Sequence, residues 1–336
     1  MDARLTQTID PRPAGTPPTG RFAPTPSGRM HLGNVLSCLV AWLGVRSEGG
    51  RMVLRVEDLD PRARDRTTAD LLMDDLDWLG LDWDEGPYRQ SERGHAYEAA
   101  VDLLRGAGLT YPCFCTRSEL HAATAPHASD GTYVYQGTCR DLTPEQVKRL
   151  SAVRPAATRV VVPAEGDPVG DITFDDLVYG EVRECLARDC GDFLVRRSDG
   201  VFAYQLAVVV DDAAMGVTQV VRGRDLLGST CRQVWLQRVL GLATPEYAHV
   251  PLLVAPDGRR LSKRERDLDL GALRSSGMTA RHLIGRLAAS VGLAEQGEEV
   301  DADELVERFS WAALRSRVHE GDETSADVVV SPGFLD

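Results

Sequence analysis

The 336-residue sequence contains no apolar run that approaches the ~18 residues needed for a membrane-spanning helix. Its N-terminus also lacks the basic and then apolar pattern that is typical of a secretory signal peptide. The seven cysteines are odd in number and unevenly scattered, which is unlike a disulfide framework and favours a reducing compartment. These absences predict a cytoplasmic protein that does not interact with a membrane.

Basic residues are fewer than acidic ones: the sequence contains 38 Lys and Arg and 51 Asp and Glu, which gives a net charge of -13. This balance counts against broad, non-specific nucleic-acid binding, which depends on Lys and Arg neutralising phosphates. A local basic groove on an acidic body remains compatible with it, because the local field governs docking. The apolar content of 43% and the charged content of 26% are typical of a globular protein, and the length suggests about two domains.

The two ends of the chain contain little that a core could bury. Residues 1–20, with "PRPAGTPPTG", predict a disordered tail, and residues 318–336 look similar apart from a short apolar patch. Between them, "RFAPT" resembles a short strand entering a turn, residues 34–47 a helix and "RMVLRVED" a buried strand. "TTADLLMDDLDWLGL" predicts a helix with Thr67 or Thr68 as its cap. Strand and helix in alternation favour a parallel sheet with crossover helices.

The second half of the chain continues this α/β pattern after an interruption. "VFAYQLAVVVDDAAMGVTQVVRGRDLL" contributes two β-rich apolar runs, and "STCRQVWLQRVLGL" a helix. Residues 110–200 differ from this pattern, because they contain clustered cysteines and only short β-like segments. This difference indicates an insertion. We therefore predict a Rossmann-like α/β domain whose halves cover 21–109 and 201–270, an insertion at 110–200, a helical region at 271–317 and a tail at 318–336.

The stretch "RFAPTPSGRMHLGN" places a Pro- and Gly-rich turn between a strand and a helix, where backbone N–H groups can face phosphate. It matches neither G-x-G-x-x-G nor G-x-x-x-x-G-K-[ST]. A surface histidine beside a turn glycine would produce the same pattern. The turn nevertheless resembles the HIGH signature of class I aminoacyl-tRNA synthetases. That resemblance implies that His31 stabilises the ATP phosphates, that Gly33 lets the adenine lie close to the backbone, and that Asn34 belongs to the ATP site.

A second segment, "RRLSKRERD", resembles the other signature of the same family, KMSKS. A solvated charge run would be the plain alternative. The resemblance implies that Lys263 stabilises the charge that develops on the phosphates, with Arg260 in the place of the first family lysine. The segment also forms a local basic cluster that could serve part of a nucleic-acid site: Arg259, Arg260, Lys263, Arg264 and Arg266.

The segments "LRVEDLDPRA" and "YRQSER", together with the apolar stretch ending in "VVRGRDLL", resemble the glutamyl/glutaminyl branch of this family over residues 21 to 270. The chain after "LSKR" leaves no room for the anticodon-binding region of a full glutamyl-tRNA synthetase. It is therefore similar to the truncated bacterial paralogues of that enzyme, which attach glutamate to the queuosine base at the wobble position of tRNA(Asp). The expected partners are ATP with Mg²⁺, L-glutamate and the anticodon stem–loop of tRNA(Asp).

Glutamate carries two carboxylates and one ammonium group, so its recognition calls for guanidinium forks, a carboxylate and a hydroxyl. Glu57 is the natural partner of the α-ammonium group, while Arg21 and Arg222 suit the carboxylates. Which arginine takes which carboxylate stays open. The resemblance places the glutamate contacts at Arg21, Phe22, Ala23, Pro24, Thr25, Glu57, Tyr204 and Arg222.

Three cysteines in the predicted insertion, Cys113, Cys115 and Cys139, supply one thiolate fewer than a tetrahedral zinc site needs. His121 and His127 would be chemically more usual fourth ligands, and Tyr133 is a neighbouring candidate. The resemblance implies Tyr135 as the fourth ligand of one structural Zn²⁺ per chain. The other cysteines follow no such pattern and are interpreted as structural: Cys38, Cys185, Cys190 and Cys231.

The resemblance implies two chemical steps, formation of glutamyl-adenylate and attack of a hydroxyl on its carbonyl. Neither step needs a covalent enzyme intermediate, so no Ser/His/Asp or Cys/His constellation is expected. The alternatives are a truncated synthetase that charges a tRNA 3′ end, a pantothenate-synthetase-like ligase of the same fold, and a non-catalytic tRNA-binding paralogue.

Overall fold

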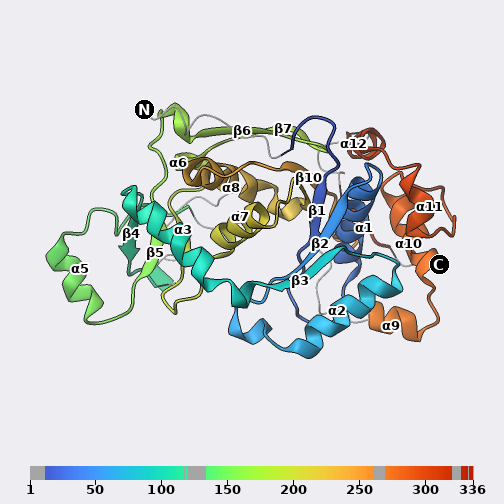
Figure 1. Cartoon of the computed structure of the whole chain (residues 1–336), viewed down its shortest axis with the longest axis horizontal. Coiled ribbons are helices and arrows are strands. Elements are labelled where there is room, and N and C mark those ends of the chain that lie inside the picture. Colours follow the sequence, from blue (N-terminus) through green and yellow to red (C-terminus); the bar gives the residue numbers. More distant parts are fainter. Residues whose placement is uncertain are drawn as a thin grey trace.

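The computed structural model describes residues 12–116, 118–119, 134–259, 269–319, 327–331 and 333–335. Its centre is formed by two sheets that meet edge to edge (Figure 1). The first is parallel, in the order β1 (Thr19–Phe22), β2 (Arg51–Val56), β3 (Glu85–Arg89). The second has the order β7 (Gly180–Cys185), β6 (Asp171–Asp176), β10 (Glu246–Val250), β9 (Gln219–Gly223), and only β7 is antiparallel to its neighbour. The sheets join where Thr218 N donates to Thr19 O at 2.8 Å, next to β9 and β1.

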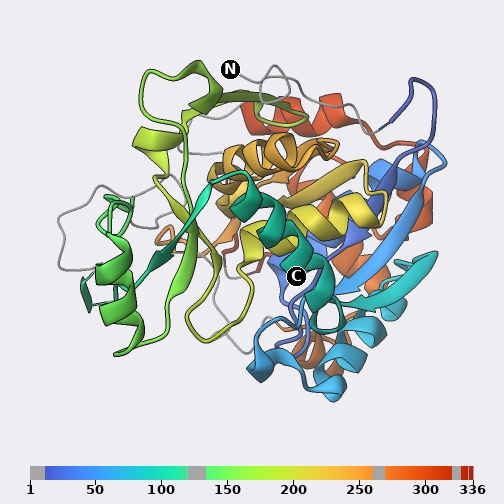
Figure 2. The ribbon, with the colours of Figure 1, turned by 60° about the vertical axis from the view of Figure 1, so that its left-hand side comes forward.

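Helices cover both faces of these sheets, as Figures 1 and 2 show. Strand β2 shows why both faces must be covered, because Met52 and Leu54 enter one apolar core while Val53 enters the other. The first core includes α1 (Leu32–Arg46) and α2 (Arg66–Trp78), and the second includes α3 (Gly94–Gly106), α7 (Tyr204–Ala214) and α8 (Leu227–Leu240). The α/β class with a parallel sheet, predicted from the sequence, is confirmed.

Two local predictions are wrong. The run "YQLAVVVDDAA", which we expected within the first of the two β-rich segments, is helix α7. This helix is enclosed by α3, α8 and β8, so its apolar residues are continuous and hide the helical period. Helix α2 is capped by Asp65 rather than by Thr67 or Thr68, because the Asp65 carboxylate accepts a hydrogen bond from Thr67 N at 2.9 Å.

The interval 110–200 contributes to two different sheets. Strands β4 (Thr110–Cys113), β5 (Ala157–Val160) and β8 (Phe193–Arg196) form a separate antiparallel sheet, which α5 (Pro144–Ser151) accompanies at one end of the molecule (Figure 1). Strands β6 and β7 of the same interval instead extend the main sheet through β10. The short helix α6 (Leu186–Asp189) leads from β7 back to β8.

The C-terminal helices lie at the opposite end of the molecule (Figure 1): α9 (Leu270–Ser275), α10 (Ala280–Ser290), α11 (Ala302–Val306) and α12 (Trp311–His319). Beyond them, β12 (Val328–Val329) pairs in parallel with β11 (Leu253–Val254), so part of the expected tail is tied to the body. Short 3₁₀ turns occur at Pro61–Ala63, Gln90–Glu92, Pro168–Gly170 and Arg224–Leu226. Among the described residues, no helix is both long and apolar enough to cross a membrane.

Candidate active site

A cavity of about 400 Å³ opens at the carboxyl ends of β1, β2 and β9, beside the N-terminus of α1. Ligands bind at this edge of the sheet in doubly wound α/β folds. The cavity brings together all of the ATP and glutamate residues predicted from the sequence that lie in the described ranges. They are Arg21, Phe22, Ala23, Pro24, Thr25, His31, Gly33, Asn34, Glu57, Tyr204 and Arg222. Lys263, with Arg260, Arg264 and Arg266, lies outside the described residues.

The first turn of α1 is held so that Gly33 faces the cavity. His31 is the N-cap residue of α1, and its carbonyl accepts from Asn34 N at 2.9 Å and Val35 N at 3.1 Å. A methyl group built on Gly33 would meet only the His31 ring, at 3.5 Å, which is an ordinary van der Waals contact. The protein's own packing therefore does not require glycine at position 33, and the space above this residue is left to the cavity.

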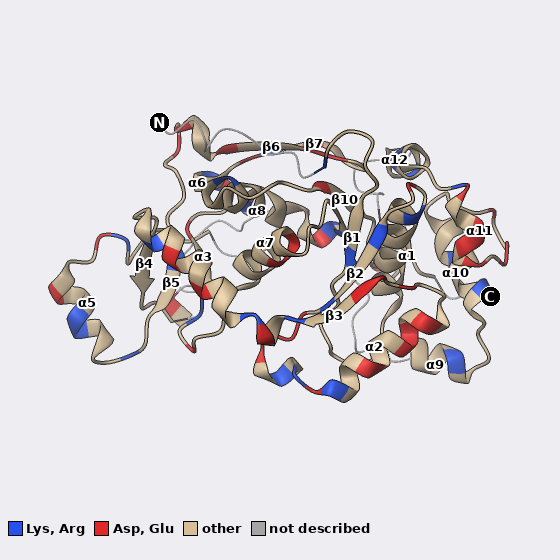
Figure 3. Ribbon diagram, viewed as in Figure 1, with Lys and Arg blue, Asp and Glu red and all other residues tan. Residues whose placement is uncertain are grey.

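Buried charge fixes the same turn to neighbouring helices. The fully buried Asp75 of α2 accepts from Met30 N at 2.8 Å and pairs with Arg29. Arg274 of α9 joins them through Asp74, at 2.7 Å. Figure 3 shows the acidic residues of α2 and the basic residue of α9 on neighbouring helices. The turn is further tied to residues that follow the basic segment, because Leu270 N donates to Met30 O at 3.0 Å.

A second buried charge network underlies the floor of the cavity. The Arg55 guanidinium, fully buried, donates to Asp212 at 2.6 Å and to Glu57 Oε1 at 3.2 Å. Arg21 lies beside the same Asp212 carboxylate, with Nε 3.5 Å from Oδ1. Burial raises the pKa of Glu57, and the charges of Arg55 and Arg21 oppose this shift. Besides Asp225, the cavity thus presents the Glu57 carboxylate and the guanidinium groups of Arg21 and Arg222, which together complement an ammonium group and two carboxylates.

Arg222, at the end of β9, is 5% exposed and is held on all of its nitrogens. The guanidinium donates from Nε to His249 Nε2 at 3.1 Å. Nη1 donates to Gln233 Oε1 (2.8 Å) and Tyr204 Oη (3.2 Å), and Nη2 donates to Thr230 Oγ1 (2.7 Å) and Leu226 O (3.5 Å). The bonds to Thr230 and Gln233 are therefore the shortest of the five, and those to Tyr204 and Leu226 are the longest.

The cavity also contains residues that the sequence reasoning missed. Val221, Gly223, Asp225 and Leu226 flank Arg222 in the chain, so their proximity to that arginine was the available signal. Ser27 lies in the turn before α1, and the others follow strand β10 or lie on the first turns of α1, where the helical period would have placed them. The additional lining residues are Ser27, Ser37, Cys38, Ala41, Val221, Gly223, Asp225, Leu226, Pro251, Leu252 and Leu253.

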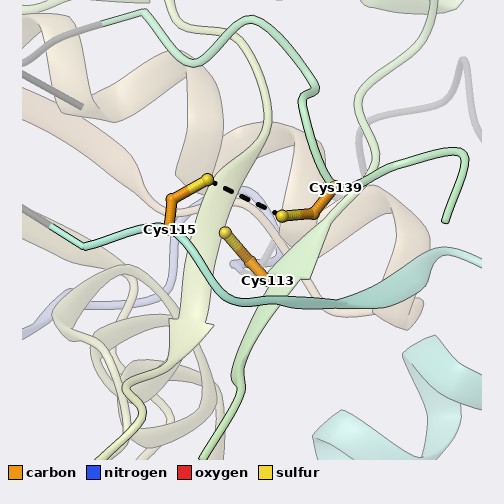
Figure 4. Close-up of side chains that lie close together, drawn as sticks. All are labelled: Cys113, Cys115 and Cys139. Carbon is orange, nitrogen blue, oxygen red and sulfur yellow. Dashed lines mark hydrogen bonds between the residues drawn. The ribbon is translucent and has the colours of Figure 1, made fainter. Parts of the chain in front are cut away.

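A separate cluster of sulfur ligands lies on the small antiparallel sheet. The Sγ atoms of Cys113, Cys115 and Cys139 lie within 4.8 Å of one another, and Figure 4 shows the three side chains converging. The Tyr135 hydroxyl lies 3.6 Å from Cys113 Sγ and 3.5 Å from Cys115 Sγ. Three thiols and one phenol therefore face a common centre, which fits the donor set of a four-coordinate metal site. The alternative ligands Tyr133, His121 and His127 lie outside the described residues.

Arg159 of β5 supports this cluster from behind. Its Nε donates to Cys113 Sγ at 3.3 Å, and its guanidinium carbon lies 3.8 Å from the centre of the Tyr135 ring. Burial alone would raise the pKa of Cys113, but hydrogen bonds from the Cys115 backbone and from Arg159 outweigh it, so the pKa lies below its usual value. Burial dominates at Cys115 and raises the pKa of that thiol to about 11.

Comparison with known proteins agrees with this geometry. The family model of the class I tRNA synthetase (E and Q) catalytic domain matches residues 19–324. Glutamyl-Q tRNA(Asp) synthetases of Symbiobacterium thermophilum and Deinococcus radiodurans are 48% and 46% identical, covering 88% and 86% of this chain and 93% and 95% of their own. The crystal structure of a glutamate tRNA ligase from Elizabethkingia meningosepticum in complex with its amino acid has a TM-score of 0.76 at 26% identity, covering 95% of this chain and 68% of that chain. The chain therefore belongs to the class I tRNA synthetases (E and Q), and within them to the glutamyl-Q tRNA(Asp) synthetases.

Proposed function

We propose that this protein activates L-glutamate with ATP and transfers the glutamyl group to the queuosine base at the wobble position of tRNA(Asp). The observation that carries the proposal is the single cavity in which Arg21, Glu57, Tyr204 and Arg222 meet the turn containing His31 and Gly33. These residues come from four distant parts of the chain. Relatives that share 46–48% of their residues with it are named for the same activity.

In the first step, the α-carboxylate of glutamate attacks the α-phosphorus of ATP in line. The bond from that phosphorus to the bridging oxygen breaks, and pyrophosphate leaves with its charge stabilised by His31 and Lys263. ATP enters as its Mg²⁺ complex, and the metal neutralises phosphate charge. The adenine occupies the open space above Gly33. This space is free because glycine has no side chain to fill it.

Glutamate is bound through its three charges. Glu57 accepts from the α-ammonium group, and its Oε1 is fixed by Arg55, so the carboxylate is pre-oriented at no cost during binding. Arg21 and Arg222 take the two carboxylates. Arg222 can exchange its long bonds to Tyr204 and Leu226 for a carboxylate, while its shorter bonds hold it in place.

In the second step, a queuosine hydroxyl attacks the carbonyl carbon of glutamyl-adenylate, AMP leaves and the hydroxyl proton passes to solvent. We assign the acceptor site to the rim of the cavity and the small antiparallel sheet. An anticodon stem–loop suits such a site because its bases can be splayed out and read singly. The basic segment at 259–266 supplies local positive charge for the phosphates despite the acidic total.

We assign one structural Zn²⁺ to Cys113, Cys115, Tyr135 and Cys139. Bound there, the metal would cross-link β4 to the segment that carries Tyr135 and Cys139, and so hold the outer part of the small sheet together. The Arg159 guanidinium offsets part of the negative charge that three thiolates and a phenolate bring to one ion.

The activation step is tested by ATP–pyrophosphate exchange without tRNA. We expect exchange that depends on glutamate, with Lys263→Ala losing about 2 to 4 kcal/mol of transition-state stabilisation. Glutamine is the matched control, because it lacks only the side-chain carboxylate. Exchange supported equally by glutamine would contradict the assignment of the two arginines.

The transfer step is tested with labelled glutamate and tRNA from cells that can or cannot make queuosine. We expect label only in queuosine-containing tRNA(Asp), within the nuclease fragment that carries the anticodon, and none in tRNA(Glu). Label in the 3′-terminal fragment, or equal labelling of both tRNA pools, would instead favour a truncated glutamyl-tRNA synthetase.

A further inference from the structure

Arg222 is held by a buried relay that runs away from the cavity, through His249 of β10 to Asp176 of β6. Both His249 and Asp176 are 0% exposed. Arg222 Nε donates to His249 Nε2 at 3.1 Å, and His249 Nδ1 lies 2.6 Å from Asp176 Oδ2. Neither His249 nor Asp176 is among the residues that line the cavity, whereas Arg222, which donates to His249, is one of them.

The hydrogen bonds in this relay determine which imidazole nitrogen carries the proton. An arginine N–H can only donate, so His249 Nε2 must present its lone pair to Arg222. At the far end, Asp176 Oδ1 accepts from Val178 N at 3.0 Å and Tyr179 N at 2.9 Å. These backbone donors keep the carboxylate an acceptor, and its Oδ2 accepts a hydrogen bond from His249 Nδ1–H. Burial lowers the pKa of His249 and so favours the neutral ring. The hydrogen bond with Asp176 opposes this shift without overcoming it.

Two further buried groups accept hydrogen bonds from Arg222. Thr230 Oγ1 and Gln233 Oε1 each accept from one terminal nitrogen, at 2.7 and 2.8 Å. With His249 on Nε, three of the five N–H groups are fixed by buried partners. One N–H on each terminal nitrogen remains on the long bonds to Tyr204 and Leu226, and this pair matches the two oxygens of a carboxylate.

We propose that His249 and Asp176 are positioning residues for the glutamate site, in which Asp176 fixes His249 as its Nδ1–H tautomer so that Nε2 holds Arg222 ready for a substrate carboxylate. The inference rests on the proposed function, because it takes glutamate as the ligand of Arg222. By this inference, His249 and Asp176 help to determine the affinity for glutamate although neither touches it.

Asp176→Asn in the full chain inverts the relay. The amide oxygen of the new side chain can still accept from Val178 N and Tyr179 N, so its NH₂ group faces His249 Nδ1. Nδ1 must then accept, and the ring proton moves to Nε2. There it points at the Arg222 N–H, and the hydrogen bond between them is lost. We expect the KM for glutamate in ATP–pyrophosphate exchange to rise about 10- to 100-fold, as for loss of one hydrogen bond to a charged group, with the KM for ATP unchanged. ¹⁵N NMR of the His249 ring should show the proton moved from Nδ1 to Nε2.

A matched pair of variants separates positioning from simple core filling. His249→Gln places an amide oxygen near the position of Nε2 and keeps an acceptor for Arg222, whereas His249→Asn keeps only a donor for Asp176. We expect the KM for glutamate to rise at least five times more in His249→Asn than in His249→Gln. Tyr247→Phe is the control on the same strand. It keeps the ring, whose centre lies 5.3 Å from the Arg222 guanidinium carbon, and loses only the buried hydroxyl bonded to Gln237 at 2.9 Å, so its KM for glutamate should stay at the wild-type value.

Several outcomes would overturn the inference. One is an Nδ1–H ring retained in Asp176→Asn, and another is a KM for glutamate that follows thermal stability alone across the four variants. Equal KM values in the two His249 variants would do the same. If the wild-type protein shows no glutamate-dependent exchange, the proposed function fails, and with it the glutamate role of the relay. Wild-type exchange with an unaltered KM in Asp176→Asn refutes only the relay.

Discussion

Replacing Gly33 by alanine should leave the fold at least as stable and weaken ATP binding. A methyl group at this position meets only the His31 ring, at 3.5 Å, so the free protein accommodates it. Gly33 is the second residue of α1, and alanine in a helix is favoured over glycine by at most about 1 kcal/mol. The free energy of unfolding should therefore stay equal or rise by up to that amount.

The same methyl group occupies the space that we assign to the adenine. An extra methyl in a filled contact costs typically about 1–3 kcal/mol, which corresponds to a rise of about 5- to 150-fold in the KM for ATP. The assays are urea unfolding for stability and ATP–pyrophosphate exchange at varied ATP. Glutamate should be held at saturation, and its KM should change little because its site lies around Glu57 and Arg222.

Gly44 in the same helix gives a control with the opposite expectation. A methyl group there would lie 2.4 Å from Trp311 Cζ2 and 2.9 Å from Gln219 Oε1, and Gly44 is not among the residues that line the cavity. Gly44→Ala should thus destabilise the fold by about 1–3 kcal/mol and leave the KM for ATP unchanged. A Gly33→Ala protein with wild-type KM for ATP would refute the assignment of adenine to this turn.

Three other predictions concern the metal, the turn and the amino-acid site. Purified protein should contain about one zinc per chain by elemental analysis, and Cys139→Ser should lose it while Cys185→Ser keeps it; full occupancy in Cys139→Ser would remove this ligand from the site. Asp75→Asn should lower the free energy of unfolding by about 1–3 kcal/mol in urea titrations and raise the KM for ATP, because it weakens the support of the turn; an ATP effect without a stability effect would contradict this cause. Arg222→Lys should raise the KM for glutamate in exchange assays at least tenfold, since a lysine keeps the charge but not the fork; a wild-type KM would exclude a bidentate contact.

The sequence was informative wherever a pattern had a local cause. The turn before α1 and the alternation of strands and helices around it follow from residues that neighbour one another, and the structure places them as expected. The run in α7 was assigned to the wrong element because a helix enclosed on several sides shows no polar face. In the same way, Thr67 and Thr68 suggested a cap, although Asp65, slightly earlier, provides it.

The buried polar residues could not be predicted in the same way. His249 lies in an apolar strand and Asp176 at the end of another, 73 residues earlier in the chain. Their pairing depends on β6 lying next to β10, a topology that no spacing in the sequence specifies. Arg55 likewise finds Asp212 across 157 residues, so its role was visible only once α7 was packed against the sheet.

The joining of β1 to β9 has a consequence for synthesis of the chain on the ribosome. Arg21 donates to the carbonyl of Val221, which lies 200 residues further along, so the cavity wall cannot close until that residue has emerged. At a synthesis rate of about 5–20 residues per second, roughly 10 to 40 s pass between the emergence of β1 and that of its partner β9. Through this interval β2 protects one edge of β1 only, and the other edge is open to pairing with foreign strands. The yield of folded protein should therefore depend on how quickly translation proceeds between these two strands, and on chaperones that shield the waiting edge.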